Sequence, residues 1–295
     1  MRAQNDSMRL LRCALCLVAF VLCASRGAAA YPALWVVEGA HSRVYLFGTI
    51  HILKPDRKWH SPVLDAAIAE SRELWLEVPD AGDVTAVLPS LESLGLDPTH
   101  PLSSKLSKTD LARVDAAART MGAGGEAAFE PFRPWFVGMM LSTLPLLKAG
   151  YDPNSGVDQQ LRNTFVAAGK TVRGFETIDQ QLHFLADLPQ DEEVAFLDTT
   201  LDSVDSAASN TDRIVALWSN GNVSELAATE DDVRRDPALY NALVVSRNAA
   251  WAQQLDARLR QGGVSFVAVG AAHLAGPASV QADLTKRGYR VRRLQ

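Results

Sequence analysis

Two histidines in this sequence close the same short pattern near opposite ends of the chain. His51 closes the segment 48–51 (Gly-Thr-Ile-His) and His273 closes the segment 270–273 (Gly-Ala-Ala-His), each directly after an apolar run. A third apolar run ends on Glu77. Short apolar runs bounded by Gly or Pro are typical of buried strands, and open α/β sheets bind ligands beyond the carboxyl ends of their strands. The pattern therefore predicts that His51, Glu77 and His273 meet within about 8 Å.

Two imidazoles and one carboxylate can activate water in two ways. As a three-ligand set, His51, His273 and Glu77 could hold a divalent ion such as Mn²⁺, Co²⁺ or Zn²⁺ and leave one position for water, whose pKa the ion lowers towards neutrality. Without a metal, Glu77 or one histidine would accept a proton from water while the other histidine stabilises the developing oxyanion. Both mechanisms make the three residues catalytic, and the sequence leaves the choice open.

Four further polar residues are candidates for substrate binding at the same site, each with a structural alternative. Arg247 interrupts the apolar stripe of a predicted helix, so it either binds an acidic group of the substrate or forms a structural ion pair. Glu176 follows a short strand and either faces the site or caps the next helix. Asp158 is either a residue of a helix terminus or a carboxylate that orients a ligating histidine. Asn248, next to Arg247, is either a site residue or a structural one.

The secondary-structure elements that must position these residues predict an α/β fold. Residues 34–50 form a predicted hairpin, and a helix with Ser61 as its N-cap and Pro62 as its first residue leads to the strand that ends at Glu77. This strand–helix–strand unit predicts parallel strands whose carboxyl ends share one sheet edge. We expect a central mixed, largely parallel sheet with the site at the carboxyl ends of its strands.

Helical segments are predicted at several other places. Residues 83–155 are mainly helical, with one helix over 111–121 behind a capping box at Ser107 and a second over 135–148, and we expect them to form a helical insertion in a single α/β domain, 31–295. An apolar helix of this length is too short to cross a membrane comfortably. One long helix is predicted from about residue 236 to 260.

The first 30 residues have the pattern of a secretory signal peptide: arginines, a short apolar run and an Ala-rich cleavage site before Tyr31. All three cysteines lie in this segment, so the mature chain would have neither a thiol ligand nor a disulfide. Its removal leaves 25 basic and 33 acidic side chains, a net charge of −8. We expect an exported protein, periplasmic or secreted, with no transmembrane segment after cleavage and no basic surface for nucleic acid.

The order of these motifs along nearly the whole mature chain resembles that of the TraB/PrgY/GumN family. The residues that carry the resemblance are Trp35 to Glu77, Gly156-Val157-Asp158, Gly169-Lys170, Gly174 to Thr177, Gln180-Gln181, Arg247-Asn248 with Trp251, Val267 to Gly276, and Gly288-Tyr289. The same family includes the Tiki proteins, which are membrane-tethered metalloproteases, and more distantly it resembles the erythromycin esterases and ChaN-like proteins. The resemblance implies that His51 and His273 are paired site histidines and that Glu77 is the acidic member.

The resemblance and the residues together favour an exported hydrolase that depends on a divalent metal and acts on peptides or another small-molecule substrate. An alternative is a protein of the cell envelope that captures a peptide or haem without turnover, as PrgY-like and ChaN-like proteins are associated with doing. A third is a scaffold for envelope or polysaccharide assembly that keeps the histidines for structure alone. Glu77 favours hydrolysis, because haem ligation needs only the histidines.

Overall fold

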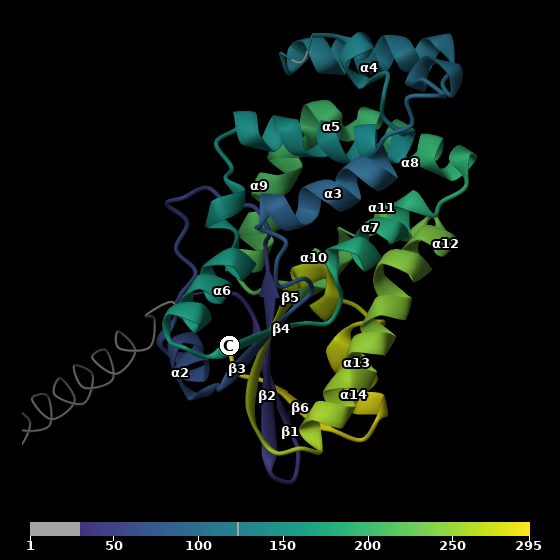
Figure 1. Ribbon diagram of the computed structural model, residues 1–295. Coiled ribbons are helices and arrows are strands. Elements are labelled where there is room, and N and C mark those ends of the chain that lie inside the picture. The colour runs from purple at the N-terminus through teal and green to yellow at the C-terminus, as the bar shows by residue number, and fades with distance from the viewer. Residues whose placement is uncertain (1–29, 123, 230) are drawn as a thin grey trace, which may run out of the picture. The chain divides into compact units, whose positions relative to one another are not determined.

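The centre of the fold is a mixed sheet built from the apolar runs that the sequence marks as strands. In a computed structural model, which describes residues 30–122, 124–229 and 231–295, the strand order is β4-β3-β5-β2-β1-β6 (Figure 1). β2, β5, β3 and β4 pair in parallel, whereas β1 is antiparallel to β2 and β6. The α/β class with a largely parallel sheet is thus confirmed. The strands are β1 (Leu34–Glu38), β2 (Ser42–Thr49), β3 (Glu73–Leu76), β4 (Thr171–Gly174), β5 (Gly263–Gly270) and β6 (Arg290–Arg293).

Helices account for most of the remaining described chain. The predicted signal segment, 1–30, lies outside the described residues apart from Ala30. The α-helices are α2 (Pro62–Glu70), α3 (Val84–Gly95), α4 (Lys108–Thr120), α5 (Pro134–Lys148), α6 (Val157–Ala167), α7 (Ile178–Ala186), α8 (Gln190–Ser203), α9 (Ala207–Ser219), α10 (Val223–Ala228), α11 (Asp231–Arg234), α12 (Pro237–Tyr240), α13 (Ser246–Leu259) and α14 (Val280–Lys286). Shorter helical turns are η1 (Leu102–Ser104), η2 (Glu126–Phe129), η3 (Pro153–Ser155), η4 (Val204–Ser206), η5 (Asn241–Val245) and η6 (Ala271–Leu274).

Strand β5 lies between β2 and β3 and pairs in parallel with both. The predicted strand–helix–strand unit is present with α2 as its crossover, but a strand from the far end of the chain is inserted between its two strands. Helix α2 begins where the sequence predicts: Ser61 Oγ accepts a hydrogen bond from Leu64 N at 3.0 Å, and Pro62 is the first helical residue. The parallel direction brings the carboxyl ends of β2, β5 and β3 to one edge.

Helices cover both faces of the sheet (Figure 1). On one face, Phe165 of α6 and Trp218 of α9 share a buried cluster with Phe47 and Phe266 of the sheet. On the other face, α13 and α14 bury a second cluster around Trp251. Covering both faces explains why β5 is apolar almost throughout, since an interior parallel strand exposes neither side to water.

The helical region extends beyond the predicted insertion. α4 begins at Ser107 as expected, with Ser107 Oγ accepting a hydrogen bond from Asp110 N at 3.1 Å. α5 packs mainly on α8, and α3 packs on α7, so helices after β4 share the cores of the earlier ones. Among the helices that the structure describes, none has both the length and the apolar character that crossing a bilayer requires.

The predicted long helix over 236–260 is present as a continuous helical segment, 237–259, with one π-helical turn inside it. α12 and α13 are joined by η5, a π-helical turn at Asn241–Val245. Helix propensity and hydrophobic periodicity do not distinguish a π-helical turn from regular α-helix, so the sequence did not predict this turn. π-helical turns inside α-helices are frequent at functional sites, and this one ends two residues before Arg247.

Candidate functional site

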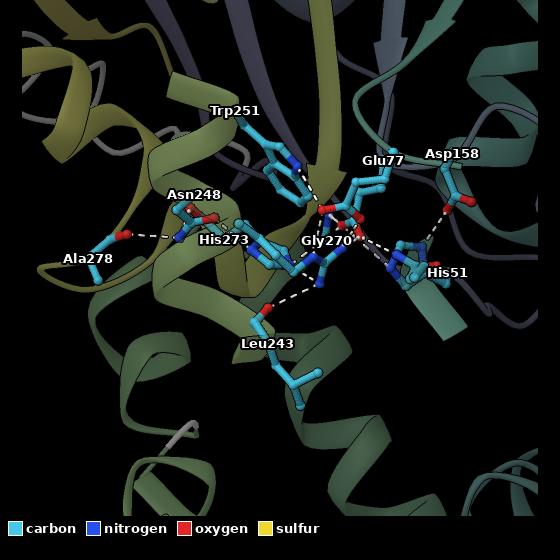
Figure 2. A network of polar contacts seen from close by, with 12 residues as sticks. His51, Glu77, Asp158, Leu243, Asn248, Trp251, Gly270, His273 and Ala278 are labelled. Carbon is cyan, nitrogen blue, oxygen red and sulfur yellow. Dashed lines mark hydrogen bonds and ion pairs between the residues drawn. The ribbon is translucent and has the colours of Figure 1, made fainter. Parts of the chain in front are cut away.

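Three side chains from three strand ends meet at the carboxyl edge of the sheet. His51 lies two residues beyond β2, Glu77 directly follows β3, and His273 lies in η6 directly after β5. Nε2 of His51 is 3.9 Å from Glu77 Oε1, and Nε2 of His273 is 3.8 Å from the same oxygen (Figure 2). The strand-end pattern therefore predicted the convergence of these residues.

His51 is oriented by the start of α6. Its Nδ1 lies 3.1 Å from Asp158 Oδ1 (Figure 2), and because a carboxylate only accepts hydrogen bonds, Nδ1 carries the proton and Nε2 faces Glu77. Val157 N donates to Ile50 O at 2.9 Å and ties α6 to the segment that carries His51. Desolvation opposes protonation, but the hydrogen bond to Asp158 and the charges of Asp158 and Glu77 raise the pKa of His51 to about 9.

His273 is the buried counterpart of His51: 8% of its side chain is exposed, against 59% for His51. Asn248 Nδ2 donates to Ala278 O at 2.8 Å, so the amide presents Oδ1 to His273 Nδ1, 2.7 Å away (Figure 2). Nδ1 therefore carries the proton and Nε2 keeps its lone pair. Burial, with the positive charge of Arg247, lowers the pKa of His273 to about 4, although Glu77 opposes this shift.

Glu77 is held in place at both oxygens. Oε1 accepts a hydrogen bond from Gly270 N at 2.6 Å, and Oε2 accepts from Arg247 Nη2 at 2.7 Å and from Gln181 Nε2 at 3.1 Å. Burial opposes ionisation, but the two histidines, Arg247 and the Gly270 N–H stabilise the carboxylate and lower the pKa of Glu77 to about 2. The site thus contains a fixed anion between two oriented imidazoles.

Arg247 uses all of its donors inside the protein. Nε and Nη2 donate to the two oxygens of Glu176, both at 2.9 Å, and Nη2 also donates to Glu77. Nη1 donates to Leu243 O at 3.0 Å and lies 3.3 Å from His273 Nε2. A guanidinium has five N–H groups, so none is left for an acidic group of a substrate. The sequence left Arg247 as either a residue that binds an acidic group of the substrate or a member of a structural ion pair. Its contacts in the structure are those of a structural ion pair.

The surroundings of Arg247 fix its position further. Its guanidinium lies 4.8 Å from the centre of the Trp251 ring and 5.3 Å from that of Phe184, distances at which a cation is attracted to an aromatic face. Trp251 Nε1 also donates to Glu176 Oε1 at 2.9 Å. Glu176 therefore anchors Arg247 and does not cap a helix: Thr177, through its capping box with Gln180, caps α7.

Some of the site residues named from the sequence face solvent and others do not. His51, Glu77 and Asp158 line a cavity of about 260 Å³, together with Gln159 and Gln181. Asn248, with no exposed surface, holds His273 from behind. Gln181 and the carbonyls that hold Arg247 and Asn248 were missed. Of these, only Gln181 could have been predicted from the sequence. It lies in the first turn of a helix that follows a strand-end carboxylate, and Asp158 likewise lies in the first turn of α6.

The residues present fit a divalent ion in type and orientation. Both imidazoles turn Nε2 towards Glu77, with Nδ1 held by Asp158 and by Asn248, the arrangement in which ligating histidines are usually oriented. Gly270 keeps the space between them open: a Cβ there would lie 3.0 Å from Glu77 Oε1 and 3.3 Å from His51 Nε2. As placed, no three His, Asp or Glu side chains of the described residues form a ready metal-binding group, and Arg247 Nη1 occupies the lone pair of His273.

Comparison with known proteins identifies the family. The sequence profile of the TraB/PrgY/gumN family matches residues 33–293, which include every strand of the sheet and the whole site. A protein of Treponema pallidum (strain Nichols), named only as an uncharacterized protein, is 26% identical in an alignment that covers 93% of this chain and 89% of the relative. No solved structure gives a significant match. Because the profile matches almost the entire described chain, this protein belongs to the TraB/PrgY/gumN family.

Proposed function

We propose that the protein is an exported hydrolase that activates water with His51, Glu77 and His273, with a divalent ion as its cofactor. One observation carries the proposal: Nε2 of each histidine lies within 3.9 Å of the same oxygen of Glu77, beside an open cavity. Two imidazoles with oriented Nε2 atoms and a carboxylate are a ligand set of catalytic metal sites. An ion would bind in exchange for the Nε2 proton of His51 and for the contact of Arg247 Nη1 with His273. The signal-like segment at 1–30 supports export.

The protein's own residues have separate tasks in this proposal. Asp158 and Asn248 each hold an Nδ1–H, so that both Nε2 atoms are turned towards the centre of the site. Glu77 would hold the ion together with the two Nε2 atoms, while Arg247 and Gly270 N–H keep the carboxylate from moving.

The low pKa of Glu77 supports a cofactor. A general base works best when its pKa lies near the operating pH, and a carboxylate with a pKa of about 2 is a weak base for free water. When bound by His51, His273 and Glu77, a divalent ion would lower the pKa of water and polarise a carbonyl of the substrate. We choose peptides as the first substrates because the sequence resembles the Tiki metalloproteases.

The test is hydrolysis of a mixed peptide library by the purified protein, followed by mass spectrometry, with metal content measured on the same sample. We expect cleavage, which His51→Ala, His273→Ala and Glu77→Gln each reduce at least 100-fold. His100→Ala is the matched control, since His100 is exposed and, among the described residues, its side chain bonds to its neighbours Asp97 and Thr99 alone. Equal activity in all variants contradicts the proposal. A variant-sensitive binding of peptide or haem without turnover would favour ligand capture instead.

A further inference from the structure

Two glutamine side chains line the cavity beside the proposed water-activating residues. Gln159 lies in the first turn of α6, next to Asp158, and Gln181 lies in the first turn of α7. Gln159 is therefore next in sequence to the residue that orients His51, and Gln181 hydrogen-bonds to Glu77. Both side chains are partly exposed.

The amide of Gln181 has a fixed orientation. Its Nε2 donates to Glu77 Oε2 at 3.1 Å, and because a carboxylate only accepts, the nitrogen of this amide must be the atom that faces Glu77. Oε1 then remains as an acceptor. It has no hydrogen-bond partner among the described residues, and it is not enclosed away from solvent. A ligand in the cavity can therefore reach a preoriented acceptor next to the catalytic carboxylate.

The amide of Gln159 lies against Gly82, on the loop that follows Glu77. A Cβ at position 82 would come within 2.6 Å of Gln159 Oε1 and 3.2 Å of Nε2, so the absence of a side chain at Gly82 leaves room for the amide where it lies. The amide lines the cavity, and no hydrogen bond joins it to another side chain or to the backbone within the described part of the chain. Its donor and acceptor are therefore available to a ligand.

The rest of the cavity favours a neutral ligand. The two carboxylates, Glu77 and Asp158, outnumber the one cation, His51, and so disfavour anions. The other lining residues, apart from the two glutamines, are small or apolar: Leu76, Val78, Ala81, Gly82, Pro153 and Ala268. Binding sites of this kind use a few placed polar groups in an apolar surround to fix orientation. A secondary amide offers one N–H donor and one carbonyl acceptor, which match the free acceptor of Gln181 and the free donor of Gln159.

We infer that Gln159 and Gln181 bind a secondary amide group of the substrate, Gln181 Oε1 accepting its N–H and Gln159 Nε2 donating to a carbonyl. The inference rests on the proposed function, because it assigns a substrate class to the same site. It makes both glutamines specificity-determining residues: an amide whose N–H is replaced leaves the Gln181 acceptor without a partner, and such losses discriminate strongly between otherwise similar ligands.

The test uses a defined probe, N-acetylalanine N′-methylamide, and its two analogues in which one or the other amide N–H is methylated. Dissociation constants come from NMR titration of the full protein. We expect at least fivefold weaker binding of one analogue to the wild type. Gln181→Met, which keeps the side-chain length but not the acceptor, should bind that analogue and the parent equally. Gln159→Met should weaken all three ligands to a similar extent.

Gln254→Met serves as the matched control, because Gln254 lies on α13 outside this cavity. Equal binding of the three probes to the wild type, unchanged discrimination in Gln181→Met, or no binding at 50 mM overturns the inference. Thermal unfolding of each variant shows whether the fold is kept. The readout is binding, so a protein that discriminates the probes but hydrolyses no peptide contradicts the proposed function alone, and peptide hydrolysis without discrimination contradicts the inference alone.

Discussion

Arg247 and Glu77 form an ion pair with 2.7 Å between Nη2 and Oε2, and only 8% and 7% of their side chains are exposed. Glu176, 10% exposed, shares the same guanidinium at 2.9 Å. One buried cation thus serves two buried carboxylates, and it also lies beside His273. Buried charges are tolerated only when they are paired and hydrogen bonded, so the geometry of the candidate site depends on this arginine.

Replacing Arg247 should therefore destabilise the protein and not merely inactivate it. Arg247→Ala removes the buried cation that the two carboxylates share, and we expect a loss of about 3–5 kcal/mol in the free energy of unfolding, measured by urea denaturation. Arg43→Ala is the control: it breaks an exposed pair with Glu70 and should cost less than about 1 kcal/mol. Similar losses in both variants would show that Arg247 does not have this structural role.

Asn248 should act on the reaction only through His273. Asn248→Leu removes the acceptor of the Nδ1 proton and leaves a buried donor unpaired, which costs about 1–3 kcal/mol. We expect kcat to fall at least tenfold with little change in KM, because Asn248 is buried behind the histidine. Nitrogen-15 NMR of the imidazole reports the tautomer directly; an unchanged tautomer in this variant would contradict the assignment.

Gly270 should be intolerant of even one methyl group. Its φ of −46° is accessible to any residue, so Gly270→Ala brings no backbone strain of the left-handed kind. The added Cβ would nevertheless lie 3.0 Å from Glu77 Oε1. We expect loss of hydrolysis and of bound metal with circular dichroism unchanged. Full activity in this variant would mean that the space beside Gly270 is not used.

The titration of His51 in metal-free protein should depend on Asp158. The pKa of His51 is raised from 6.5 to about 9, so the stability that its charge contributes is complete below about pH 6.5 and is lost as the pH rises towards 9. Asp158→Asn should lower the pKa of His51 towards 6.5, and NMR of the ring protons measures it. Because His51 is more than half exposed, the difference in stability between wild type and variant should be below about 1 kcal/mol and should shrink above pH 6.5. An unchanged titration would contradict this account.

Removal of metal should stop hydrolysis without unfolding the protein. The two clusters that cover the sheet do not include His51, Glu77 or His273, so a chelator should abolish activity while the circular dichroism spectrum stays the same. Mn²⁺, Co²⁺ or Zn²⁺ should restore activity, with affinity weakening as the pH falls below about 9, because protons compete with the ion for His51. Full activity in excess chelator, with no metal found by elemental analysis, would leave the metal-free mechanism.

The sequence was sufficient for the features that depend on local pattern. The apolar runs before His51, Glu77 and His273 mark buried strands, and Ser61-Pro62 and Ser107 mark helix starts, because caps and strand periodicity are properties of a few neighbouring residues. The three strand ends could be assigned to one edge because parallel strands have a common direction. The proximity of His51 and His273 could therefore be predicted although they are far apart in the sequence.

Only the tertiary structure decided which residues far apart in the chain are in contact. The sequence left Arg247 as either a ligand for a substrate or a structural cation, since a count of donors needs the positions of Glu77, Glu176 and Leu243 around it. It likewise could not place β5 between β2 and β3, or detect the π-helical turn η5, whose composition is that of ordinary helix. Strand order and side-chain partners are set by packing across the whole sheet, and no local pattern encodes them.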